Sequence, residues 1–146
     1  MSTDVQTPVF YFTTRVYYED TDAGGVVYYA NYLKFAERAR SEWLRTLGIN
    51  QQELQAKEGL GFVVTHATID FKLPARLDDE IIIETRLHRL SKARMSMRQM
   101  LRRNNAVLVE MTVEIACVRG AKPARLPEEM TVLLAAFLPR HNEEFT

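Results

Sequence analysis

The chain has 146 residues, 47% hydrophobic and 26% charged, a composition typical of one ordinary globular domain with a core of its own. Lys and Arg together number 19, as do Asp and Glu, so no overall charge attracts nucleic acid or acidic membranes. We therefore expect no nucleic-acid partner. The single cysteine, Cys117, excludes an internal disulfide and a cysteine-based zinc cluster, and its alternating apolar neighbours predict a buried small side chain.

No segment carries the signals of export or membrane insertion. The N-terminus lacks a basic stretch followed by an apolar one, and no run reaches the roughly 18 uninterrupted apolar residues that a spanning helix needs. We expect a cytoplasmic protein without a transmembrane segment. We also expect residues 1–146 to form one domain, with residues 1–8 and 139–146 frayed at its ends.

The first part of the chain predicts a strand, a turn and a long helix. The run from Val9 to Tyr18 is rich in aromatic, Thr and Val residues, which favours a strand, and residues 19–25 are turn formers. From about Ala30 to Leu47 the apolar residues recur at steps of three and four. This spacing predicts a helix with one buried stripe, formed by Tyr32, Ala36, Ala39, Trp43 and Leu47. Gly48 stands where the cap of that helix is expected.

The rest of the chain predicts an antiparallel sheet. After a short helix at residues 51–58, strand-like runs cover residues 62–71, 80–90, 94–103 and 106–118. Short turns separate them, among them Asn104-Asn105, a pair suited to a tight hairpin. A terminal helix is predicted at residues 130–138. The whole is an α+β domain with one long helix laid across the sheet.

The stretch from Tyr17 to Arg40 combines acidic residues with glycines between the predicted strand and the predicted long helix. Its pair Gly24-Gly25 allows a tight turn directly after the acids. The acids are Glu19, Asp20 and Asp22. Free N–H groups at a helix N-terminus can polarise a carbonyl or hold an anion, so this arrangement indicates chemistry at the turn.

This stretch resembles the signature of the 4-hydroxybenzoyl-CoA thioesterase branch of the hot-dog superfamily. The segments that carry the resemblance are Asp20-Thr21-Asp22, residues 24–28, Asn31-Tyr32, residues 37–40, Phe62-Val63-Val64 and residues 74–79. The resemblance extends from about Val16 to Pro127. Within that family, the chain looks most like the acyl-CoA thioesterases associated with the Tol-Pal system of Gram-negative bacteria. It implies a hot-dog fold, in which an antiparallel sheet of about five strands wraps around one long helix.

The resemblance also implies a reaction and its residues. The implied reaction is hydrolysis of an acyl-CoA thioester to the free acid and CoA, with Asp22 as nucleophile or general base. The backbone amide of Tyr29 is implied to polarise the thioester carbonyl. Many relatives have His at the position of Tyr29, but an amide donor does not depend on its side chain. The residues implied to line the substrate pocket are Gly25, Val26, Tyr28, Tyr32 and Phe62.

Basic residues are expected to bind the phosphates of CoA. Lys92 and Arg94 are the best candidates, with Lys122 and Arg125 behind them. No cofactor is expected, and no metal site either, because His66, His88 and His141 show no ligand spacing with one another or with the acids.

The remaining acids of this stretch are expected to have structural roles. Asp20 and Glu19 are expected to shape the turn. Glu37 could be a second carboxylate near the site, but an ion pair with Arg40, three residues further along the helix, is the favoured interpretation.

Two other functions stay open. One is a non-catalytic module that binds acyl groups or CoA within a cell-envelope complex. The other is a hot-dog dehydratase, which usually sets a His against a carboxylate, whereas this motif has no His at the start of the helix. The resemblance and an expected free sheet edge predict a homodimer or homotetramer. A Tol-Pal partner could hold the protein at the periphery of the inner membrane.

Overall fold

A computed structural model describes residues 8–139 of the chain. The expectation of frayed ends falls almost entirely outside this range. The elements in chain order are β1 (Phe10–Arg15), the short 3-10 helix η1 (Tyr18–Asp20), α1 (Asn31–Thr46), α2 (Gln51–Glu58), β2 (Leu60–Phe71), β3 (Glu80–Leu90), β4 (Arg94–Arg103), β5 (Ala106–Arg119), β6 (Lys122–Pro123) and α3 (Glu128–Ala135).

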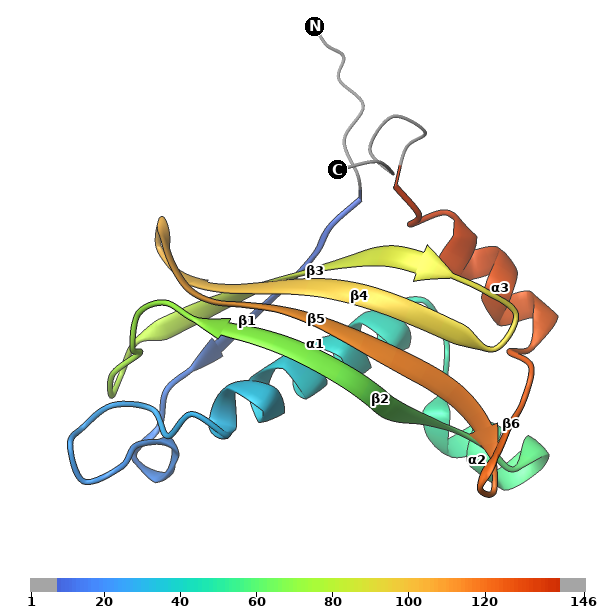
Figure 1. Ribbon diagram of the computed structural model, residues 1–146, viewed down its shortest axis with the longest axis horizontal. Helices are drawn as coiled ribbons and strands as arrows, with labels where there is room; N and C mark the ends of the chain where they lie inside the picture. Colours follow the sequence, from blue (N-terminus) through green and yellow to red (C-terminus); the bar gives the residue numbers. More distant parts are fainter. Residues whose placement is uncertain (1–7, 140–146) are drawn as a thin grey trace, which may run out of the picture.

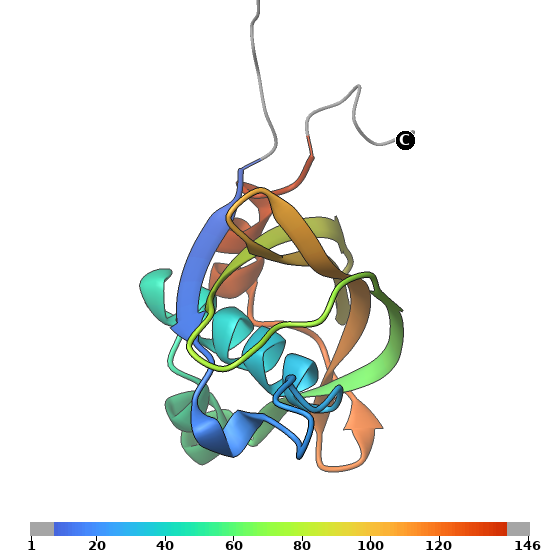
Figure 2. The same cartoon turned by 90° about the vertical axis from the view of Figure 1, so that its left-hand side faces the viewer.

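The strands form one antiparallel sheet in the order β1-β3-β4-β5-β2, and β6 pairs with β5. The sheet lies across α1 and curls around it (Figure 1 and Figure 2). Arg103 pairs with Ala106, so Asn104 and Asn105 make a two-residue hairpin turn, with Asn104 at a φ of 52°. The predicted α+β class and the hot-dog arrangement are therefore confirmed.

The core lies between α1 and the concave face of the sheet. Ala36 and Ala39 of α1 are fully buried, so the strands approach the helix backbone closely. In β5, residues at alternate positions from Val109 to Cys117 face this core, as their period-two pattern predicts. Burial raises the pKa of the Cys117 thiol, which is 1% exposed and acts as a small apolar side chain.

The buried face of α1 is wider than the predicted stripe. Phe35 and Leu44 are buried as well, whereas Leu47 is only half-buried. A helix enclosed by a curled sheet buries more of its circumference than one that lies on a flat surface, and this explains the difference.

Several elements differ from the predictions, and β2 begins at Leu60 rather than at residue 62. The first strand ends at Arg15 rather than at residue 18, because the chain turns into the 3-10 helix η1, which begins at Tyr18. The terminal helix covers residues 128–135 rather than 130–138. The two-residue β6 was not predicted, since Pro123 is unfavourable within a strand and fits only at an edge.

Candidate active site

The loop before α1 is a small hairpin that places Asp22 at its turn. Asp22 N–H donates to the carbonyl of Val26 at 2.8 Å, and Gly25 N–H donates back to the carbonyl of Asp22 at 3.1 Å. Gly25 has a φ of 82°, a conformation that other L-residues rarely adopt. Tyr28 N–H donates to the carbonyl of Asp20 at 3.0 Å, which ties the second arm of the hairpin to the first. The loop occupies one end of the molecule (Figure 1).

The Asp22 carboxylate is held by one oxygen and exposed to solvent. Its Oδ1 accepts hydrogen bonds from Gly24 N–H at 2.8 Å and from Val26 N–H at 3.4 Å. Its Oδ2 accepts none within residues 8–139. The loop therefore orients this carboxylate and leaves one oxygen free to react.

Asp20 has a structural position, as predicted. Its Oδ2 accepts the N–H of Tyr17 at 2.8 Å, and its carbonyl accepts the Asn31 side-chain amide at 2.9 Å. These two bonds join the end of β1, the loop and the first residue of α1. Glu19 points into solvent.

The start of α1 leaves backbone donors free. Asn31 N–H donates to Tyr28 and Tyr32 N–H to Tyr29, but the N–H groups of Tyr29 and Ala30 meet no acceptor among the described residues. Ala30 occupies the cap position without a capping side chain, and the first turn of α1 contains no acid. The positive end of the helix dipole is thus available to a ligand.

Four aromatic rings cluster at this end of α1. The Tyr29 ring lies 4.9 Å from that of Tyr28 and 6.1 Å from that of Phe71, which also lies 5.8 Å from Tyr32. The Tyr32 hydroxyl accepts the N–H of Ala75 at 2.9 Å, and burial raises the pKa of this phenol, so it stays neutral. Phe71, at the end of β2, was not among the predicted pocket residues. No local pattern in the sequence indicated that its ring would lie near Tyr29 and Tyr32, which are distant from it along the chain.

Most of the predicted site residues lie on the loop that carries Asp22 and Tyr29 and in the first turn of α1, but three others lie elsewhere. Phe62 stands near the opposite end of β2 from Phe71. Lys92 and Arg94 belong to the turn between β3 and β4. Arg103, at the other end of β4, contacts Pro74 and Asp79 near the Asp22 loop, so Arg94 lies roughly 30 Å away along that strand.

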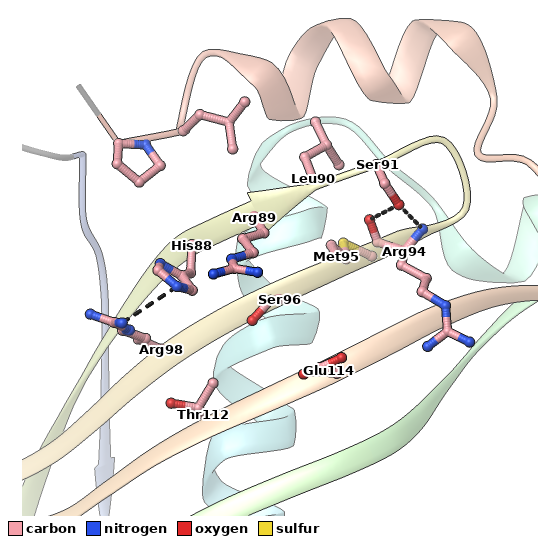
Figure 3. A pocket seen from close by; sticks show the side chains of 12 residues that line it. His88, Arg89, Leu90, Ser91, Arg94, Met95, Ser96, Arg98, Thr112 and Glu114 are labelled. Atoms are coloured by element: carbon pink, nitrogen blue, oxygen red, sulfur yellow. Dashed lines mark hydrogen bonds between the residues drawn. The ribbon is translucent and has the colours of Figure 1, made fainter. Parts of the chain in front are cut away.

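Arg94 lines a separate groove on the outer face of the sheet, with a volume of about 820 Å³ (Figure 3). Arg89, Arg98 and His88 share this groove, and the pKa of His88 is lowered by its burial and by the two arginines. Arg98 Nη2 lies 3.4 Å from His88 Nε2. The groove is basic, but it is not part of the Asp22 site within one chain.

The predicted ion pair between Glu37 and Arg40 is wrong. Arg40 Nη1 instead donates to Oε1 of Gln99 on β4 at 2.9 Å. The sheet curves over this face of α1 and offers a buried acceptor, whereas the Glu37 side chain is exposed. Within residues 8–139, no group of three or more His, Cys, Asp or Glu side chains is arranged to hold a metal ion.

A curled sheet around one helix, with a carboxylate loop at the uncapped start of that helix, defines a hot-dog protein with a thioesterase-type site. A family model described as the thioesterase-like superfamily matches residues 16–137. The chain therefore belongs to the thioesterase-like superfamily, as its sequence motif predicts.

Similar proteins narrow this assignment. The chain is 48% identical over 123 residues to an acyl-CoA thioesterase YbgC from Haemophilus influenzae, covering 83% of this chain and 90% of that protein. It is 42% identical over 129 residues to an acyl-CoA thioester hydrolase YbgC from Escherichia coli, covering 86% and 96%. A crystal structure of a probable thioesterase from Bartonella henselae superposes with a TM-score of 0.79 at 46% identity, covering 82% of this chain and all of that one.

Proposed function

We propose that the protein hydrolyses acyl-CoA thioesters to a free acid and CoA. The observation that carries this proposal is the free oxygen of Asp22 on the loop that leads into α1, together with the amides of Tyr29 and Ala30 at the helix start, which meet no acceptor in the described part of the chain. The similarity to the two YbgC thioesterases supports the choice of substrate class.

In the proposed reaction the thioester oxygen accepts a hydrogen bond from Tyr29 N–H. Asp22 then attacks the carbonyl carbon, or it takes a proton from a water that attacks. The amide stabilises the oxyanion by about 3 kcal/mol, the C–S bond breaks, and the CoA thiolate leaves and takes up a proton. In the nucleophilic route, a water then hydrolyses the mixed anhydride and releases Asp22.

The proposed substrate pocket uses the loop backbone as well as side chains. A Cβ added at Gly25 would meet nothing within 4 Å, so a substrate can approach the main chain there. Val26, Tyr28 and Tyr32 come from the loop and the first turn of α1, and we add Phe71 to them. Phe62 is proposed to lie deeper in the pocket, towards the far end of β2.

We also propose that the chain forms a homodimer, or a tetramer made from two such dimers, through the edge strand β2. This strand pairs with β5 on one side only, and Val63, Val64 and Phe71 on it are 45%, 49% and 52% exposed. Antiparallel pairing of two β2 strands would bring the Lys92 and Arg94 end of one copy towards the Asp22 end of the other. The two basic residues could then bind CoA phosphates across the interface. The mass of the protein in solution tests the assembly.

No helix within residues 8–139 is long and apolar enough to cross a membrane. We propose a cytoplasmic protein, held at the inner membrane only through a Tol-Pal partner. Cell fractionation with and without that partner system tests this.

The activity is tested with a panel of acyl-CoA thioesters and the variant Asp22→Asn. We expect kcat to fall about 100- to 10,000-fold, the range for loss of an acid–base or nucleophilic group. Glu19→Gln is the matched control, because Glu19 is exposed in the same loop, and it should keep full activity. Full activity in Asp22→Asn would remove Asp22 from the mechanism. Tight binding of acyl-CoA without turnover would favour the non-catalytic binding module.

A further inference from the structure

A second polar cluster lies midway along α1, between the helix and the sheet. Gln99 on β4 accepts a hydrogen bond from Arg40, and its Nε2 donates to the carbonyl of Ala36 and to Thr85 Oγ1, both at 3.0 Å. Gln99 and Thr85 are 2% and 1% exposed. The side-chain amide of Gln99 is therefore fixed, and it holds the guanidinium of Arg40 in place.

Arg40 keeps hydrogen-bond donors that this cluster does not use. A guanidinium has five N–H donors, and the bond to Gln99 occupies one. No carboxylate among the described residues forms an ion pair with it. Burial lowers the pKa of Arg40, and the nearby charge of Glu37 opposes this shift. A half-buried cation without a direct ion pair is costly, so its free donors can gain from a partner.

The Arg40 side chain lies at a cavity of about 150 Å³ between α1 and the edge strand β2. Arg40 lines it with Glu37 and Ser41 on the helix side, and Phe62, Val64 and Met97 on the sheet side. The volume can hold several non-hydrogen atoms, because one water molecule needs only about 10–15 Å³ of such accessible space. One wall is apolar and the other polar, which fits a carbon chain that ends in an oxygen.

The distance from the proposed reaction centre to the cavity can be compared with the length of an acyl chain. Helical side chains lean towards the N-terminus, so the Arg40 guanidinium lies over the turn of Ala36, to which Gln99 also binds. From Ala30 to Ala36 the helix rises about 9 Å. An extended carbon chain advances roughly 1.3 Å per bond of about 1.5 Å, so about seven bonds span this distance.

We propose that this cavity receives the distal end of the acyl group, and that Arg40 selects acyl groups with an oxygen about six to eight bonds beyond the thioester carbonyl. A terminal carboxylate accepts two hydrogen bonds from the guanidinium. A terminal hydroxyl accepts one from Arg40 and can donate one to Glu37. A plain hydrocarbon end would remove water from the guanidinium and leave its donors unpaired. This inference rests on the proposed thioesterase function and names its substrate class.

The test compares kcat/KM for three CoA thioesters of equal chain length: octanoyl, ω-hydroxyoctanoyl and octanedioyl. We expect the protein to prefer at least one oxygenated thioester by about tenfold or more. Arg40→Met should abolish this preference and still hydrolyse octanoyl-CoA. Arg38→Met is the matched control, because Arg38 is exposed on the same helix with its guanidinium 6.0 Å from the Phe35 ring, and it should change nothing. Glu37→Gln separates the two ligand types. It removes a negative charge, so kcat/KM for octanedioyl-CoA should rise, and it removes the carboxylate acceptor of the terminal hydroxyl, so kcat/KM for ω-hydroxyoctanoyl-CoA should fall.

Arg40→Lys is measured alongside, because loss of a half-buried guanidinium can unfold the chain. It keeps the charge without the planar fork and should lose several-fold of the preference for octanedioyl-CoA. An unchanged preference in a folded Arg40→Met or Arg40→Lys variant overturns the proposal. If such a variant keeps the preference but has a lower mass in solution than the unaltered protein, the proposal is also overturned, and Arg40 instead belongs to a contact between two copies of the chain. If no thioester is hydrolysed, the proposed function fails. Calorimetric binding of octanedioate and octanoate, to the unaltered protein and to the variants, then decides the role of Arg40 separately.

Discussion

The two polar regions along α1 are built in opposite ways. At the start of the helix the donors are the backbone amides of Tyr29 and Ala30, and the reactive carboxylate of Asp22 is exposed on a loop. Midway along the helix, the polar groups are the side chains of Arg40 and Gln99, enclosed between helix and sheet. The first region is open to a ligand, and the second is mostly part of the core.

This difference predicts how each region responds to substitution. A site made of backbone donors tolerates an exchange of side chains, because the amide at position 29 is present whichever non-proline residue stands there. A buried network depends on the identity of each side chain, because every polar group that loses its partner stays buried. Substitutions at the helix start should therefore change rates, and substitutions in the network should change stability.

The largest effect on stability is expected for Gln99→Leu. This change leaves Thr85 and the inner N–H of Arg40 without partners, and it should lower the free energy of unfolding by about 3 kcal/mol. Urea denaturation measures the loss. Gln52→Leu, at an exposed position of α2, is the control and should have little effect. Equal stability of the two variants would show that the network is not needed for the fold.

A smaller loss of stability is expected for Tyr32→Phe. Tyr32 shares a feature with each region, because it lies in the first turn of α1 and is buried in the core. The N–H of Ala75 would lose its acceptor at a buried position, which costs about 1–3 kcal/mol. Tyr11→Phe, on an exposed residue of β1, serves as the comparison in the same denaturation series. A loss no larger than that of Tyr11→Phe would contradict the role given to this hydrogen bond.

A rate effect with little change in stability is expected for Gly24→Ala. The new Cβ would lie 3.3 Å from Asp22 Oδ1, so the carboxylate must move by a few tenths of an ångström. We expect kcat/KM to fall about tenfold, since misplacement by 1 Å can cost about 100-fold. Gly61→Ala is matched to it, because its Cβ would make an ordinary 3.6 Å contact with Gln55. The expectation fails if both variants keep full activity.

The fold could be predicted well from the sequence where local signals were strong. The bounds of β3 and β4 match the predicted runs, because turn-forming residues marked both ends of each run. The Asp22 loop was also visible, since its acids, glycines and helix start lie within one continuous stretch. These features could be predicted because each is formed by residues that are close together in the sequence.

The rest depends on contacts between distant segments. Gln99 lies 59 residues from Arg40, so nothing near Arg40 in the sequence indicated that partner, and the local pairing with Glu37 looked better. Phe71 reaches Tyr29 only because the sheet curls. The spacing of Lys92 and Arg94 from Asp22 likewise follows from the length of the strands.

The most direct test of the backbone's role compares two substitutions at Tyr29. Tyr29→Pro removes the amide N–H, for which residues 8–139 offer no acceptor, and proline is well tolerated near a helix start. Tyr29→Phe keeps the amide and removes the hydroxyl. The account predicts that kcat falls about 100- to 1,000-fold in Tyr29→Pro, with an unchanged melting temperature, and stays near that of the unaltered protein in Tyr29→Phe. Full activity in a folded Tyr29→Pro variant, or loss of activity in Tyr29→Phe, would contradict it.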